Sequence, residues 1–191
     1  MTTTRMEAFS DGVVAILITI MVLELRAPHD ASLAGLRPII PVMLSYLLSF
    51  VFLGIYWNNH HHLLQAAEQV NGVVLWANLH LLFWLSLIPF VTAWMGENHF
   101  TKWPVALYGT VLLMSAIAYN ILVQALLALH GPDSLLASAL GSDFKGKISL
   151  AFYPVAILMA FVKPSLSCAL YILAAIIWFL PDRRIERTII R

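Results

Sequence analysis

Six long apolar segments, separated by short polar stretches, constrain the fold of this chain more than any other feature. A run of about 20 apolar residues is long enough to cross the hydrocarbon core of a bilayer as an α-helix. The segments cover approximately residues 9–25, 39–60, 70–95, 104–129, 148–162 and 165–180. The first, fifth and sixth are at or below the short end of the spanning range. We therefore expect an all-α membrane protein in which residues 1–191 form a single domain of six transmembrane helices.

The composition supports this fold class and excludes others. Hydrophobic residues make up 61% of the 191 residues and charged residues only 11%, whereas a soluble domain is about half apolar and about a quarter charged. A soluble fold of this size could not bury so much apolar surface. We expect neither disorder nor nucleic-acid binding. The single cysteine, Cys168, cannot form an internal disulfide and lies in an apolar run, where a small buried side chain is expected.

The distribution of Lys and Arg predicts the orientation in the membrane. With six crossings, both ends of the chain lie on one side, which collects seven basic residues, and the other side has four. The first set is Arg5, Lys145, Lys147, Arg183, Arg184, Arg187 and Arg191, and the second is Arg26, Arg37, Lys102 and Lys163. By the positive-inside rule we expect both termini in the cytoplasm and the protein in the cell membrane.

The first apolar segment carries an aliphatic stripe on one side and an ionisable residue on the other. At about 100° per residue, Thr19, Ile20 and Leu23 fall within about 60° of Ile16, whereas Asp11 lies about 140° away. An unpaired carboxylate near the membrane is costly, so Asp11 is expected to find partners within its own bundle. The alternative is that Ser10 or Asp11 caps the N-terminus of the helix.

A second polar cluster lies at the end of the second segment and within the third. Trp57 and His61 are four residues apart and share a helix face. The predicted topology puts this face on the same side of the membrane as Asp11. We therefore predict a hydrogen-bonded network, with Asn78 or His80 as further candidate members. Its predicted core consists of Arg5, Ser10, Asp11, Trp57 and His61.

The same residues do not predict a metal site or an enzyme. The consecutive histidines 60–62 point about 100° apart on a helix, so they cannot all reach one ion. The sequence has no His-Glu-x-x-His motif, no cysteine near these histidines and no nucleophile–base pair. We expect hydrogen-bonded histidines, with at least one exposed to the headgroups, and no cofactor.

The motif Arg-x-x-x-Phe-Ser-Asp at residues 5–11 resembles the head of the first helix in the transmembrane protein 175 family of potassium channels. Trp57 and His61 resemble the W-x-x-x-H signature at the end of the family's second helix. Asn78 and Pro89 lie in a third segment of similar character. The six-segment plan covers essentially the whole chain.

This resemblance implies a homotetramer in the lipid bilayer, with potassium ions permeating a pore lined by the first helices. The family lacks the TVGYG filter of ordinary potassium channels, and this sequence has no TVGYG. The resemblance implies a gate of bulky aliphatic side chains, which carry over as Ile16, Ile20 and Leu23. Thr19 matches a hydroxyl position linked with potassium selectivity. The residues of the predicted network match the contacts that hold the first helix in place.

Several alternatives remain open at this stage. Glu24 is a candidate charge at the outer mouth of the pore, or it pairs with Arg26 or Arg37. His61 either senses pH or stays neutral and hydrogen-bonded. The competing function is a small ion-coupled transporter or an intramembrane enzyme that uses Asp11 and the histidines. The third hypothesis for the function is a non-conducting structural membrane protein.

Overall fold

The computed structural model describes residues 3–140 and 144–179, with side chains described over 3–138 and 150–178. Every regular element in this part of the chain is a helix, which confirms the expected all-α class. The elements are α1 (Thr3–Leu23), the 3-10 helix η1 (Leu33–Ile39), α2 (Ile40–Gln65), α3 (Gly72–Ser86), α4 (Ile88–Glu97), α5 (Lys102–His130), α6 (Leu135–Leu140), α7 (Phe144–Val162) and α8 (Pro164–Phe179).

Four helical stretches are long and apolar enough to cross a membrane, which confirms a membrane protein. They are Thr3–Leu23, Leu33–Gln65, Gly72–Glu97 and Lys102–His130. The stretches Leu150–Val162 and Pro164–Trp178 are apolar but shorter, so their crossing stays a prediction. The basic tail with Arg183, Arg184, Arg187 and Arg191 lies outside the described residues, as do the side chains of Lys145 and Lys147.

The third predicted segment is divided into two helices rather than being continuous. Helix α3 ends at Ser86, Leu87 forms a turn, and α4 begins at Ile88. Pro89 follows directly, within the first turn of α4. A proline has no N–H to donate, and its ring clashes with the carbonyl four residues earlier, here that of Leu85. The chain therefore restarts its helix at the proline.

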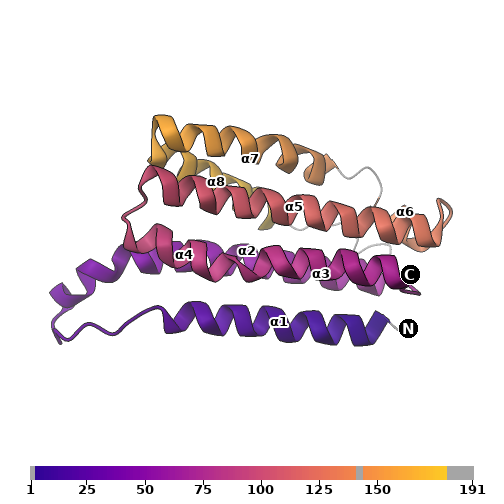
Figure 1. Ribbon diagram of the computed structural model, residues 1–191, viewed down its shortest axis with the longest axis horizontal. Helices are drawn as coiled ribbons and strands as arrows, with labels where there is room; N and C mark the ends of the chain where they lie inside the picture. Colours follow the sequence, from indigo (N-terminus) through magenta and orange to yellow (C-terminus); the bar gives the residue numbers. More distant parts are fainter. Residues whose placement is uncertain (1–2, 141–143, 180–191) are drawn as a thin grey trace.

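Helix α1 lies at one edge of the bundle, and α7 lies at the opposite edge, beyond α5 (Figure 1). Helix α1 packs mainly against α2, α3 and α4. Its buried residues recur every three or four positions: Met6, Ser10, Val14, Leu17 and Met21. This spacing defines a single packed face. On the opposite side of α1, Ile16, Thr19, Ile20 and Leu23 are exposed within the part of the chain that the structure describes.

Helix α4 approaches α2 closely at Gly96. A Cβ atom built on this glycine would lie 2.5 Å from the Ser45 Oγ and 2.7 Å from the Cα of Val42. A buried hydroxyl cluster continues the same interface, because the Ser49 Oγ lies 2.6 Å from the Thr92 Oγ1 and 3.0 Å from the Tyr108 Oη. These contacts fix the helices on which α1 rests.

Candidate functional site

The unpacked face of α1 is aliphatic along most of its length. The exposed fractions are 58% for Ile16, 41% for Ile20 and 77% for Leu23, while their neighbour Leu17 is only 5% exposed. Thr19 is exposed between them, and its hydroxyl donates to the Ile16 carbonyl over 2.8 Å. This leaves the lone pairs of the Thr19 oxygen without a donor among the described residues. The four residues therefore form an exposed stripe, here named the α1 stripe.

The packed face of α1 carries a buried chain of hydrogen bonds to α3 and α2. The Asn78 Nδ2 donates to the Ser10 Oγ over 3.0 Å, and the Ser10 hydroxyl donates to the Met6 carbonyl over 2.9 Å. The Asn78 Oδ1 lies 2.8 Å from the His60 Nε2. A carbonyl oxygen only accepts, so His60 donates from Nε2. Ser10, Asn78 and His60 are all buried, and their bonds tie three helices together.

A second, more exposed set of contacts joins the same end of α1 to α2. The Trp57 Nε1 donates to the Asp11 Oδ1 over 2.9 Å. The His61 Nδ1 lies 2.6 Å from the Glu7 Oε1. The Trp57 and His61 rings stack at 15° with their centroids 6.0 Å apart. Asp11 and Glu7 are four residues apart, so two consecutive turns of α1 are fixed to one face of α2.

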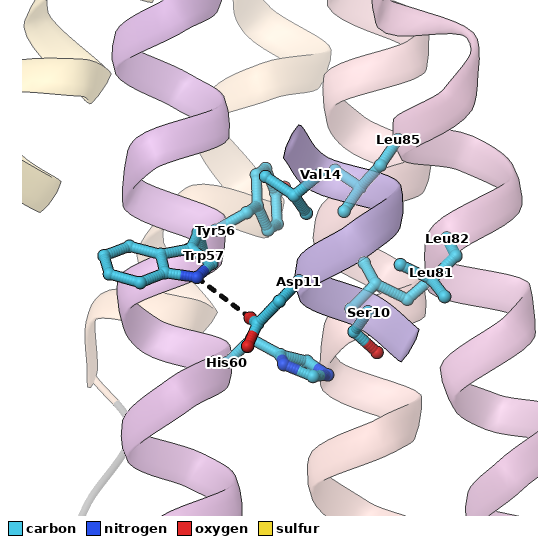
Figure 2. Close-up of a pocket in the computed structure, with 9 residues that line it drawn as sticks. All are labelled: Ser10, Asp11, Val14, Tyr56, Trp57, His60, Leu81, Leu82 and Leu85. Atoms are coloured by element: carbon cyan, nitrogen blue, oxygen red, sulfur yellow. Dashed lines mark hydrogen bonds between the residues drawn. The ribbon is translucent and has the colours of Figure 1, made fainter. Parts of the chain in front are cut away.

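A small, mainly apolar cleft lies between these helices. Figure 2 shows Asp11 and Trp57 directed toward one another across it, with His60 beside them and leucines of α3 on the other side of α1. The lining residues are Ser10, Asp11, Val14, Tyr56, Trp57, His60, Leu81, Leu82 and Leu85. Asp11 is the only carboxylate among them. Within the described residues, no group of three His, Cys, Asp or Glu side chains could hold a metal ion.

The structure differs from the predicted network at four residues, Arg5, His80, His60 and Glu7, whereas the candidate Asn78 is part of the contacts. Arg5 is exposed and has no hydrogen bond or ion pair among the described residues. Asn78 joins the network, whereas His80 instead accepts a hydrogen bond from the Trp84 Nε1 within α3, over 3.0 Å. Sequence reasoning missed His60 and Glu7.

The sequence contains a hint of the roles of Glu7 and His60, but it does not single out either residue. Glu7 is one turn before Asp11, a spacing that places both on one helix face. His60 is one of three consecutive histidines, and the sequence does not say which of them turns inward. Near the other end of α1, Glu24 is exposed and forms no ion pair with Arg26 or Arg37, both of which are described.

Comparison with known proteins identifies a family to which this chain is similar. Residues 5–89 match the family model described as endosomal/lysosomal potassium channel TMEM175. A potassium channel of Chryseobacterium sp. is 54% identical over 189 residues, which covers 99% of this chain and 98% of the relative. A potassium channel of Streptomyces collinus is 29% identical over 183 residues, 90% of this chain and 89% of the relative.

A solved structure agrees with the sequence relatives. The crystal structure of a lysosomal potassium-selective channel TMEM175 homolog from Chamaesiphon minutus has a TM-score of 0.81 and 28% identity to this chain. The match covers 93% of this chain and 96% of the other. From the identity over nearly the full length, the family model and the shared fold, we conclude that the chain belongs to the TMEM175 family of ion channels.

Proposed function

We propose that four copies of this chain form a potassium-permeable channel in the cell membrane, with α1 lining the pore. Each chain crosses the membrane six times as one domain and keeps both termini in the cytoplasm. The observation that carries the proposal is the α1 stripe: one face of α1 packs on α2–α4 while the opposite, mainly aliphatic face is left uncovered. The relatives named as potassium channels support the choice of ion.

In such a tetramer Ile16, Ile20 and Leu23 would form three apolar rings around one axis. A cation does not shed its water in an apolar ring that offers no replacement ligands, so these rings can close the pore by dewetting. Opening then requires a modest dilation or rotation of the four α1 helices. No TVGYG filter is present to provide a separate selectivity element.

Thr19 would supply four hydroxyl oxygens between these rings. Its hydroxyl proton is already directed to the Ile16 carbonyl, which leaves the oxygen available to a passing cation. Hydroxyls can partly replace the hydration shell of potassium. Selectivity over sodium is then weaker than in a filter built from backbone carbonyls.

The two sets of contacts on α2 and α3 would set the tilt and rotation of α1. The buried Ser10–Asn78–His60 chain and the Asp11–Trp57 and Glu7–His61 pairs hold its packed face. Arg5 is exposed and lies outside these contacts. Glu24 would add four negative charges at the outer mouth and concentrate cations there.

The test is potassium flux from liposomes that contain the purified protein. The Ile16→Asn variant puts four polar side chains into one of the three apolar rings, and lowering the barrier by about 1.4 kcal/mol would raise the flux about tenfold. The control is Ile172→Asn, an equally apolar position that is 49% exposed on α8, outside the proposed pore. Equal fluxes from both variants and the unchanged protein would remove Ile16 from the gate.

Thr19→Ala tests selectivity in the same liposomes. The ratio of potassium to sodium permeability is expected to fall toward one, with the total flux retained. An unchanged ratio would show that Thr19 is not a selectivity element. Saturable, coupled uptake by a single chain would instead favour a transporter.

A further inference from the structure

The connection between α2 and α3 is held by a histidine from α5. The backbone N–H groups of Glu68 and Gln69 both donate to the Nε2 of His130, over 3.0 and 3.2 Å. His130 is the last residue of α5 and is half-buried. Its other ring nitrogen, Nδ1, lies 2.9 Å from the Leu126 carbonyl oxygen one turn earlier. Both ring nitrogens are therefore engaged with backbone groups.

These partners define the protonation state of the ring. A carbonyl oxygen only accepts, so Nδ1 must carry a proton. Backbone N–H groups only donate, so Nε2 must present its lone pair to Glu68 and Gln69. Only the neutral imidazole with the proton on Nδ1 satisfies both conditions. An imidazolium ion would place a third N–H against the two backbone donors, and both hydrogen bonds would be lost.

The held segment joins the two helices that fix α1. Ala66, Ala67 and Val70 of the connection are buried, so its backbone cannot move without disturbing the core. Shortly before it, α2 carries the side chains that bind Asp11 and Glu7. Shortly after it, α3 carries Asn78, which binds Ser10. Figure 1 shows that the start of α1 and the end of α5 lie at the same end of the bundle.

We propose that His130 is a positioning residue for the channel: its neutral ring holds the α2–α3 connection, and its protonation releases that connection and loosens the grip of α2 and α3 on α1. The effect on current rests on the proposed function, whereas the effect on the connection does not. In the proposed orientation this end is cytoplasmic, so the relevant proton concentration is that of the cytoplasm.

Other ionisable groups around the contact enter the pH response. They are Glu68 in the connection, His61 and His62 in the last turns of α2, Asp133 after α5, and Lys145 and Lys147 in the first turn of α7, whose side chains are outside the described residues. The first turn of α3 and the whole of α6 carry no charged residue.

Amide hydrogen exchange of residues 66–71, corrected for the intrinsic pH dependence of exchange, tests the contact directly. In the purified full-length protein, protection of the Glu68 and Gln69 amides is expected to fall about tenfold or more between about pH 8 and about pH 5. In His130→Gln the side-chain oxygen accepts the same bonds and has no proton to gain, so protection should stay constant. The control His29→Gln removes an exposed histidine from the other end of the bundle and should keep the fall.

A second measurement needs no variant. The nitrogen chemical shifts of the His130 ring at neutral pH should report a neutral ring with its proton on Nδ1. A proton on Nε2 would overturn the proposal, as would protection that stays constant in the unchanged protein or still falls in His130→Gln.

Potassium flux at varied internal pH then tests the coupling to α1. Part of the pH dependence should disappear in His130→Gln and remain in His29→Gln. If exchange follows the prediction while flux in the two variants responds identically to pH, the coupling to α1 is overturned. If no preparation conducts potassium at any pH, the proposed function fails, and the exchange result still decides the role of His130 in the connection.

Discussion

At the scale of single residues, Asn78 is the side chain that links three helices at the site. Its oxygen accepts from His60 and its nitrogen donates to Ser10, so one amide joins α3 to both α2 and α1. All three residues are buried. A buried polar group that loses its partner bears the full cost of its desolvation, about 1–3 kcal/mol. The amide is therefore worth more than its own two hydrogen bonds.

We expect Asn78→Leu to lower the free energy of unfolding by about 1–3 kcal/mol, because the similar-sized side chain leaves the buried His60 Nε2 without its partner, while Ser10 keeps its hydrogen bond to the Met6 carbonyl. The measurement is thermal unfolding in detergent, followed by tryptophan fluorescence. The control is Ser115→Ala, which removes a buried hydroxyl whose hydrogen bond stays within α5. Similar melting temperatures for the two variants would contradict a linking role for Asn78.

At the scale of helices, small residues decide how closely α4 and α2 pack. The position of Gly96 against Val42 leaves no space for a methyl group, and the neighbouring atom is backbone, which cannot rotate away. Pro89 sets the other end of the same helix by restarting it after Leu87. Together they place α4 as one of the three helices that support α1.

Gly96→Ala is therefore expected to destabilise the protein by about 1–3 kcal/mol through overpacking. Gly54→Ala in α2 is the matched substitution, since a Cβ there meets nothing within 4 Å. In that open position alanine should be neutral or stabilise the helix by up to about 1 kcal/mol. Urea or thermal unfolding of both variants separates the two effects, and a stable Gly96→Ala protein would refute the close approach.

At the scale of the whole molecule, the edge position of α1 leaves the packing of the chain incomplete. A helix in the centre of a bundle is buried on all sides, whereas α1 is packed on one face and carries the α1 stripe on the other. In the proposed tetramer the four stripes face one another at a shared axis. This arrangement predicts close approach between equivalent residues of different chains.

A cysteine introduced as Ile16→Cys, in a Cys168→Ser background, should be linked between chains by a short thiol-reactive cross-linker. Because each chain then carries a single thiol, which reacts once, cross-linked dimers are expected on denaturing gels if the four positions surround one axis. Leu17→Cys, which is buried within its own chain, should remain monomeric under the same treatment. Equal cross-linking at both positions, or none at position 16, would argue against the central placement of α1.

Composition and the geometry of a single helix were enough to predict the membrane class and the faces of α1. Apolar runs of about 20 residues predict membrane helices, because a helix of this length spans the bilayer and satisfies its backbone N–H and C=O groups within the segment. The periodicity of about 100° per residue separates Ile16, Ile20 and Leu23 from Asp11, and the structure exposes the first three. The proximity of Trp57 to Asp11 also followed, since both residues lie on the same predicted side of the membrane.

The choice among several residues of the same type depends on how the helices pack against one another. His60, His61 and His62 differ in direction by one helical step each, so the rotation of α2 against α1 and α3 selects His60 for Asn78 and His61 for Glu7. His130 is 62 residues from Glu68, and no local pattern predicts that pairing. Hydropathy and helical periodicity are local properties and can therefore be predicted from the sequence. Hydrogen-bond partners depend on the relative rotation of packed helices, so they are seen only in the folded chain.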